Sequence, residues 1–484
     1  MTPNPEYRLL LVALAGATAV LIACAVAPEG LALIVAAVVG ATCFLTVALR
    51  WPIVFLALSI FIPQWKASWP LSRITFVDLT LVTLSGLVLG LMWMGLKHLS
   101  GLQRLRLRKL FAGQRGPLLA FFAFCLVLAL SYTYTDSPQY GASKLSRVIF
   151  IGTLFLVSGL LLIRTERDFR RFSFLFLVGA CITSVQMVLH LQRRPTVEEN
   201  VDLTRIGAGW LLGMSILLLL CYPVVHNRLR RRTTVILCLP LLIAGLIATV
   251  ARGPSVVLAV VLPIAYYVFT KRRFAATHAL AAVLLVACCA VSYLYLRRAD
   301  PEKYGAKANE LLQLSSGKSG SGSGAKRLDF YRRTLLAIPD HFLLGEGIGS
   351  WSFFYYGADR REYPHNMFLE TTFEEGILGQ ILLLAFLILM ARAIRKNLRI
   401  THNHYGVLAG ILLYCVLVGM FSGDLDDNRV LWAWAGIIMA ICRNCARLEA
   451  RPALLPRVPL RLAARNLVLV RQQPLEGSQQ SSAS

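Results

Sequence analysis

The polar stretch Tyr363–Gly376, "YPHNMFLETTFEEG", places His365 beside Asn366 in a chain that is otherwise largely apolar. A histidine side chain titrates near neutrality and can accept a proton from a hydroxyl group. His365 is therefore a candidate general base for a substrate that carries a hydroxyl. The same residue types also fit a histidine that is satisfied by neighbouring groups at the water-facing end of a helix.

Two arginines, Arg205 in "DLTRIGAGW" and Arg252 in "TVARGPS", lie at the ends of apolar stretches. An arginine keeps its charge, so near lipid it needs a partner. Arg205 either snorkels, pairs with Asp202 or binds an anion, and Arg252 either sets the topology or binds an anion. Because guanidinium groups match phosphate oxygens two at a time, the pair would suit a lipid-linked pyrophosphate at headgroup depth.

Other short motifs do not indicate a nucleotide or metal site. The sequence GKS at 317–319 resembles the end of a phosphate-binding loop, but the glycine required five positions earlier is replaced by Leu312. The single CxxC at 442–445 lacks the second pair of ligands that a zinc site needs. The segment 297–375 contains no cysteine, which excludes a disulfide framework there. We therefore expect no metal site.

Helices that cross a membrane must position these residues, because 57% of the chain is hydrophobic. Runs of about 20 apolar residues are long enough to cross a hydrocarbon core as helices. The sequence predicts an all-α bundle of about 12 to 14 spans, with one shorter run at 51–62 and the others at 9–27, 31–49, 77–96, 117–134, 147–163, 172–191, 207–225, 234–250, 255–270, 275–296, 376–391, 406–421 and 429–443.

The connections between the runs predict the orientation. Strongly basic connections alternate with mixed ones, and cytoplasmic loops carry an excess of lysine and arginine. The basic connections, expected in the cytoplasm, lie at 97–116, 164–171, 226–234, 271–273 and 392–399. The formal net charge of +25 thus reports topology, and we expect no nucleic-acid partner. The N-terminal run is expected to be the first span, not a cleaved signal.

The chain divides into four predicted parts. Residues 1–296 form spans with short loops, 297–375 form a large, mainly helical outer insertion, 376–443 form the last spans, and 444–484 form a basic cytoplasmic tail that is expected to be disordered.

Within the outer insertion, residues 325–338 show helical spacing and Pro339 ends that helix. A tight turn with closely packed backbone is expected at Gly345, Gly347 and Gly349. Pro364 is tolerated at a helix start, so we expect His365 in the first turn of a helix that runs on into the span beginning near Gly376.

The stretch "RRTLLAIPDHFLLGEGIGSWSFFYYG…YPHNMFLETTFEEGILGQILL" resembles the bacterial O-antigen ligase and polymerase superfamily. That superfamily shows an arginine-bearing helix, a proline, a glycine-rich turn, the core "HNxxLE" and then "GxxG" at the start of a span. The matching residues here are Arg332, Arg333, Pro339, Gly345, Gly347, Gly349, His365, Asn366, Leu369, Glu370, Gly376 and Gly379.

The resemblance implies about 12 spans and a metal-independent glycosyltransferase of the bacterial inner membrane that acts at the periplasmic face without a cofactor. The implied donor is a polysaccharide on undecaprenyl pyrophosphate, and for a ligase the acceptor is the lipid A–core oligosaccharide, which gives lipopolysaccharide. By resemblance, His365 is the base for the acceptor hydroxyl, and Arg205 and Arg252 hold the donor pyrophosphate. Arg332, Arg333, Asn366 and Glu370 are implied supporting residues.

Direct displacement at the anomeric carbon would invert it, with the base contributing about 10²–10⁴-fold and the arginines stabilising the departing pyrophosphate. Glu370, Glu374 and Glu375 are expected to orient His365 or to cap the helix start, with capping favoured for the last two.

Several functions share this architecture. Polymerases of the superfamily often carry outer arginines that are followed, after ten intervening residues, by a glycine. No predicted outer arginine here has that glycine, which favours a ligase over a polymerase. Ligases for other glycans stay open as alternatives. A transporter is disfavoured, because the spans contain few ionisable residues and show no inverted repeat.

Overall fold

The computed structural model describes residues 29–68, 78–100, 114–191, 199–224, 227–249, 251–269, 323–398, 406–421 and 423–449. Every regular element in these residues is a helix, which confirms the all-α class for the described part of the chain. Several predicted features lie outside the described residues: the spans at 9–27 and 275–296, the start of the insertion at 297–322, the connections at 101–113 and 271–273, and the tail from 450.

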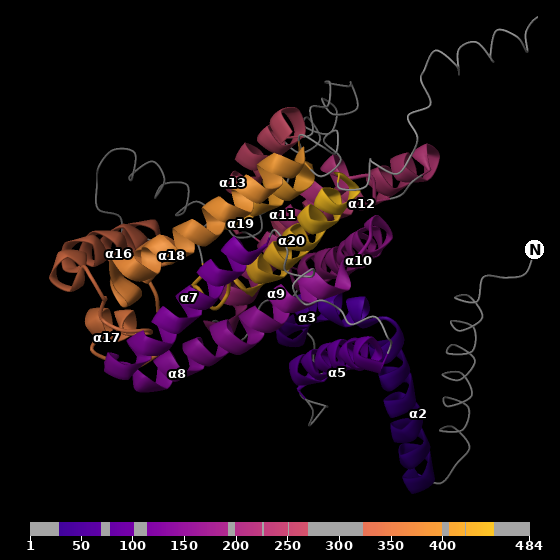
Figure 1. Cartoon of the computed structure of the whole chain (residues 1–484), viewed down its shortest axis with the longest axis horizontal. Coiled ribbons are helices and arrows are strands. Elements are labelled where there is room, and N and C mark those ends of the chain that lie inside the picture. The colour runs from indigo at the N-terminus through magenta and orange to yellow at the C-terminus, as the bar shows by residue number, and fades with distance from the viewer. Residues whose placement is uncertain are drawn as a thin grey trace, which may run out of the picture.

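The helices follow one another along the whole described chain (Figure 1). In chain order they are α2 (Glu29–Arg50), α3 (Pro52–Ser68), α5 (Leu79–Ser100), α7 (Arg115–Ser131), η1 (Tyr132–Tyr134), α8 (Pro138–Ser146), η2 (Arg147–Gly152), α9 (Thr153–Leu162), α10 (Glu166–Leu191), α11 (Glu199–Cys221), α12 (Arg228–Ala248), α13 (Arg252–Pro263), η3 (Ile264–Phe269), α16 (Ser323–Ala337), η4 (Ile338–His341), α17 (Trp351–Tyr356), α18 (Met367–Leu398), α19 (Gly406–Gly419) and α20 (Arg429–Glu449).

Six helical stretches among the described residues are long and apolar enough to cross a membrane: Leu79–Leu96, Arg115–Tyr134, Pro138–Leu162, Glu166–Leu189, Leu229–Ala248 and Met367–Asn397. The predicted runs 31–49 and 51–62 meet at a bend of 109°, and they add a seventh span if they form one broken crossing. Shorter apolar helices lie at Arg205–Cys221, Gly253–Tyr267 and Gly406–Gly419. The expected total of about 12 spans is therefore not confirmed.

Small residues bring the central helices α9 and α20 into backbone contact. A Cβ on Gly159 would lie 2.5 Å from the carbonyl oxygen of Ala433, and one on Gly436 would lie 2.0 Å from that of Leu156. Helices in membranes associate through such close approaches, because lipid tails remove the hydrophobic driving force between helices. Around this pair, the buried rings of Trp432 and other aromatic residues fill the core.

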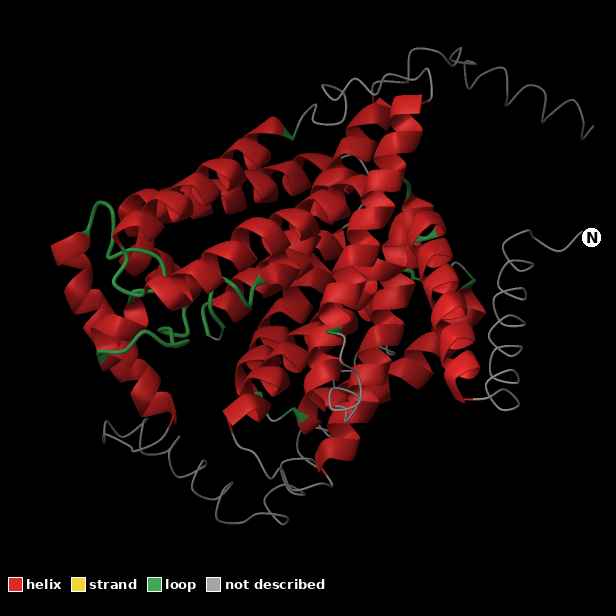
Figure 2. Ribbon diagram, turned by 90° about the horizontal axis from the view of Figure 1, so that it is seen from below, coloured by secondary structure: helices red, strands yellow, loops and turns green. Residues whose placement is uncertain are grey.

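A second, smaller apolar cluster holds α16 and α17 against the start of α18. Phe330, Trp351 and Phe373 are buried together, and the indole of Trp351 donates a hydrogen bond of 2.8 Å to the hydroxyl of Thr334. These helices lie at one end of the bundle, and the longest described loops gather at the same end (Figures 1 and 2). The described part of the predicted insertion is thus mainly helical.

The long helix α18 is interrupted at Gly376, where φ is 66° and ψ is −168°. Residues 343–350, called here the glycine turn, bind the interruption: the backbone N–H groups of Glu346 and Gly347 donate to the carbonyls of Phe373 and Glu374, both at 2.9 Å. The predicted tight turn is confirmed, but the helix does not run on unbroken into the span. A break at membrane depth is tolerated where other backbone groups satisfy the freed carbonyls.

Gly376→Ala should destabilise the protein by about 1–3 kcal/mol, because a Cβ there would lie 2.4 Å from the carbonyl oxygen of Leu343 at a positive φ. Gly357→Ala is the matched control: its φ is also positive, at 67°, but no atom lies within 4 Å of the added Cβ. Thermal unfolding in detergent compares the two variants. A Gly376→Ala midpoint no lower than that of Gly357→Ala would contradict the close contact.

Candidate active site

His365 lies just outside α18 and has a left-handed backbone, with φ at 58°. We expected it in the first helical turn, but the helix begins at Met367, and Asn366 is the residue that caps it. The Asn366 Oδ1 accepts hydrogen bonds from the backbone N–H groups of Phe368 at 3.0 Å and Leu369 at 3.2 Å. A positive φ costs a histidine about 1–3 kcal/mol, and such strain clusters at functional sites.

Aromatic rings enclose the imidazole of His365. The ring of Tyr363 meets it edge-on with centroids 4.7 Å apart, and the ring of Phe330 stacks at 6.1 Å. The His365 Nδ1 is buried without a hydrogen-bond partner among the described residues. Burial, with the positive charges of Arg327 and Lys326, lowers the pKa of His365 to about 3. The imidazole is therefore neutral at pH 7 and keeps a lone pair for a proton.

Arg327 on α16 is a cation of this site that the sequence analysis does not single out. Its Nη1 donates a hydrogen bond of 2.9 Å to the carbonyl of Phe421. A Cβ on Gly253, the neighbour of Arg252 in the chain, would lie 3.6 Å from the Cβ of the same Phe421. One short turn thus adjoins both Arg327 and the segment that carries Arg252. Arg327 also acts electrostatically on His365.

The predicted supporting arginines, Arg332 and Arg333, lie on another face of α16 and are exposed. The Nε of Arg333 lies 3.1 Å from a carboxylate oxygen of Asp329, and its guanidinium lies 5.0 Å from the ring centroid of Tyr355. Within the described residues, neither arginine makes a hydrogen bond or ring contact with His365. The structure does not bring these two together with the histidine.

Arg205 lies on α11 and is half-buried. The two residues that follow it line a cavity of about 40 Å³, and the wall of this cavity also includes Tyr363 and Asp427. The helix end that carries Arg205 therefore borders the segment that carries His365. The side chain of Asp202, which we considered as an ion-pair partner of Arg205, lies outside the described atoms.

Arg252 is the first residue of α13, and its side chain also lies outside the described atoms. The start of α13 packs on α11, because a Cβ on Gly209 would lie 3.1 Å from Pro254. Gly209 is about one helical turn beyond Arg205. The backbone segments that carry the two predicted phosphate-binding arginines are thus neighbours at one end of the bundle.

The carboxylates of α18 have a different role from the one predicted. Glu374 and Glu375 do not cap the helix start, because they lie more than a turn inside α18 and are fully buried. Glu370 and Glu374 both pair with the buried ammonium of Lys144 on α8. No direct hydrogen bond joins Glu370 to His365 in the described chain. A lone lysine within the apolar stretch Pro138–Leu162 is the sequence signal that would have found this cluster.

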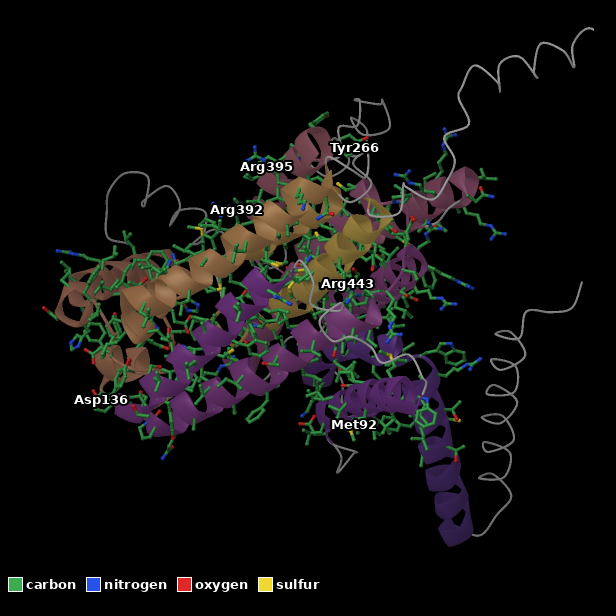
Figure 3. All side chains as sticks on the ribbon, viewed as in Figure 1. Met92, Asp136, Tyr266, Arg392, Arg395 and Arg443 are labelled. Atoms are coloured by element: carbon green, nitrogen blue, oxygen red, sulfur yellow. The ribbon has the colours of Figure 1, made fainter. Side chains whose placement is uncertain are left out.

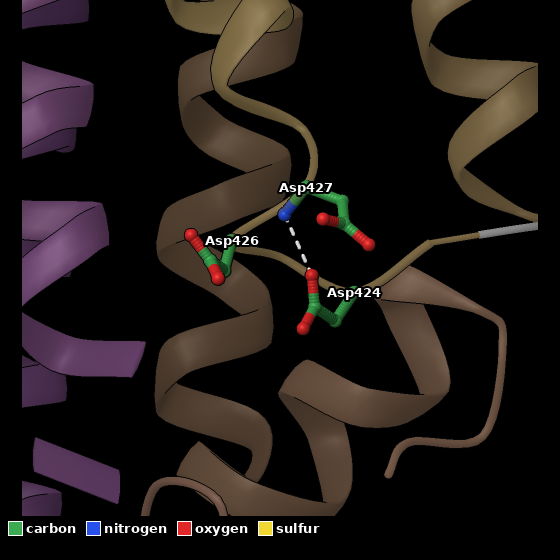
Figure 4. Close-up of side chains that lie close together, drawn as sticks. All are labelled: Asp424, Asp426 and Asp427. Carbon is green, nitrogen blue, oxygen red and sulfur yellow. Dashed lines mark hydrogen bonds between the residues drawn. The ribbon is translucent and has the colours of Figure 1, made fainter. Parts of the chain in front are cut away.

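Residues 423–428, called here the acidic loop, bring Asp424, Asp426 and Asp427 together (Figure 4). The three carboxylates could by their spacing hold a metal ion, but two guanidinium groups already pair with them. Arg361 lies 2.6 Å from Asp427, and Arg147 lies 2.6 Å from Asp426. Charge pairing with arginine accounts for the loop, and we propose no metal for it.

These observations define the class of the protein: a helical membrane protein whose bundle carries, at one end, a neutral histidine among arginine-bearing helix ends. Residues 236–384 match the family model described as O-antigen ligase, which confirms the resemblance to the O-antigen ligase superfamily. Members of this family are membrane glycosyltransferase-like enzymes that act on glycans. The matched segment includes Arg252, Arg332, Arg333, His365, Asn366 and Glu370, whereas Arg205, Lys144 and the acidic loop lie outside it. A comparison with curated proteins finds no match.

The lowered pKa of His365 predicts a pH dependence of stability. The unfolded state, with a histidine pKa of about 6.5, binds a proton that the folded state binds only near pH 3. Stability is therefore full above pH 6.5 and is lost as the pH falls below it, by up to about 1.4 kcal/mol per pH unit. Between pH 7 and 5, the thermal midpoint of the wild type in detergent should fall further than that of His365→Gln. Equal falls would show that His365 titrates normally.

Proposed function

We propose that the protein is an O-antigen ligase. It transfers O-antigen polysaccharide from undecaprenyl pyrophosphate to a hydroxyl group of the lipid A–core oligosaccharide, inverts the anomeric centre and uses no metal. The family match over residues 236–384 supports the reaction class. The observation that carries the proposal is His365, neutral and with its Nδ1 unpartnered, at the end of the bundle where the segments of Arg205 and Arg252 meet.

In the proposed reaction, His365 takes the proton of the acceptor hydroxyl while that oxygen attacks the anomeric carbon. The bond between this carbon and the pyrophosphate oxygen breaks, and its electron pair leaves with the pyrophosphate. Arg205 and Arg252 are proposed to bind the pyrophosphate two oxygens at a time and to stabilise the charge that it gains.

The cations around His365 couple the bound donor to the strength of the base. In the free protein, Arg327 and Lys326 help to lower the pKa of the imidazole. A pyrophosphate among the arginines offsets this positive field, so donor binding raises the pKa of His365 towards the working pH. The histidine becomes an effective base when the electrophile is in place.

We propose that the site faces the periplasm from the inner membrane. Arg392 and Arg395 lie far along the bundle from Asp136, which lies at the same end as α16 and α17 (Figures 1 and 3). Basic residues favour the cytoplasmic side, which leaves His365 at the periplasmic face. Donor headgroups would then meet the protein at the level where α18 begins.

Transfer in vitro from an undecaprenyl-pyrophosphate-linked glycan to lipid A–core tests the proposal. His365→Ala should lower turnover by about 10²–10⁴-fold. Arg205→Ala and Arg252→Ala should lower it by about 10²–10³-fold, because each removes charge stabilisation of the leaving group. Arg332→Ala is the matched control, an exposed arginine on α16, and should leave turnover nearly unchanged.

Chelator should not change the wild-type rate. Transfer that survives in all three site variants would reject the mechanism. Growth of the glycan chain when lipid A–core is omitted would instead identify a polymerase.

A further inference from the structure

Lys144 is a fully buried lysine in an apolar helical stretch, Pro138–Leu162, that is long enough to cross a membrane. A cation in such a place is costly unless partners surround it, and an intramembrane ionisable residue is a candidate functional residue. Lys144 donates to Glu370 Oε1 and to Glu374 Oε2, both on α18. The residue lies outside the matched family segment.

Each of these two carboxylates also binds a backbone N–H group from a different segment. Glu370 accepts from Leu425 of the acidic loop at 3.2 Å, and Glu374 accepts from Gly349 of the glycine turn at 2.8 Å. The ammonium of Lys144 therefore joins α8, the acidic loop and the glycine turn to the first part of α18. Removing it would leave two buried carboxylates without their cation.

This cluster is linked to His365 in two ways. His365 lies two residues before the first residue of α18, so movement of the helix start moves the imidazole. In the acidic loop, Asp424 raises the pKa of His365 through its negative charge, against the effects of burial and of the nearby cations. Tyr140, about one turn before Lys144 on α8, donates a hydrogen bond of 2.8 Å to Asp424.

A third carboxyl, Glu375, lies in the same buried region but has a different environment. Both of its oxygens are buried without a hydrogen-bond partner among the described residues. The ammonium of Lys144 and two backbone N–H groups already donate hydrogen bonds to Glu370 and Glu374. An ionised carboxylate without a hydrogen-bond donor would be very costly there, so we expect Glu375 in its neutral, protonated form.

We propose that Lys144 is a positioning residue for the transfer reaction, which holds His365 in its productive place through Glu370, Glu374 and the two segments that they bind. The proposal rests on the proposed function. A displacement of about 1 Å at a reacting group can cost about 10²-fold in rate. Lys144 thus acts on turnover and not on donor affinity.

The test measures transfer by Lys144→Met, Lys144→Arg and Glu375→Gln against the wild type. Lys144→Met should lower kcat by about 10²-fold while KM for the donor stays within about threefold, because the donor is held by other residues. Lys144→Arg should recover part of the lost kcat, since it restores the charge. Glu375→Gln should keep wild-type kcat and thermal midpoint, because an amide mimics a protonated carboxyl.

Lys144→Met could also fail to fold, so the triple variant Lys144→Met, Glu370→Gln, Glu374→Gln accompanies it. Breaking a buried ion pair is costly mainly because a charge is left without its partner. The triple variant leaves no such charge, because the two glutamines are neutral and nearly keep the shapes of the glutamates. It should keep a thermal midpoint close to the wild type and still show the loss of kcat. A folded triple variant with wild-type kcat would overturn the proposal, as would a raised donor KM with kcat unchanged.

A second readout separates this proposal from the proposed function. In protein with ¹⁵N-labelled histidine, Lys144→Met should shift the resonances of His365, which are identified by their loss in His365→Gln. Wild type that transfers no lipid-linked glycan would reject the proposed function, and shifted His365 resonances would still support the positioning role. Unshifted resonances would overturn that role whatever the reaction is.

Discussion

Backbone hydrogen bonds between the glycine turn and the interruption of α18 hold the polar end of the protein in place. The turn can approach the helix only because Gly345 and Gly376 have no Cβ, which in either case would lie 2.4 Å from backbone atoms of the other segment. The N–H groups of Glu346 and Gly347 then satisfy carbonyls that the break in α18 leaves free. This contact fixes the direction of the nine residues Met367–Glu375, and His365 lies just before them.

Positive charges lie around this short helical segment, and those nearest to His365 would attract an anionic donor. Lys144 is buried on its inner side and neutralises carboxylates of α18, whereas Arg327 and Lys326 act on His365 near its start. Arg327 and Lys326, which help to lower the pKa of His365, are also groups that would attract an anion. In the proposed reaction, this one arrangement would give both a neutral imidazole at rest and a stronger base once the donor is bound.

The sequence predicted the parts of this arrangement that depend on neighbouring residues. The glycine spacing at 345–349 predicted a close turn, and Pro364 predicted the start of a helix, although His365 lies before that helix and not in it. Apolar length predicted membrane helices, and six are found among the described residues. These features follow from rules that act over a few residues.

Features that depend on distant residues could not be predicted in this way. Lys144 pairs with Glu370 and Glu374, which lie 226 and 230 positions away in the chain, and no residue near Lys144 indicates these partners. The resemblance indicated Arg332 and Arg333, but the rotation of α16 turns Arg327 towards the His365 side instead. Arg361 and Arg147 reach the acidic loop from 66 and 279 positions away, so the partners of its aspartates could not be predicted from neighbouring residues.

The structure of the protein with an undecaprenyl-pyrophosphate-linked glycan bound is the most direct test of the central claim, that one imidazole and two guanidinium groups serve one anionic donor. We predict the pyrophosphate within hydrogen-bond distance, about 2.7–3.2 Å, of Arg205 and Arg252, with its sugar turned towards His365. A donor bound with its phosphates away from both arginines, or with packed helices between its sugar and His365, would contradict the account.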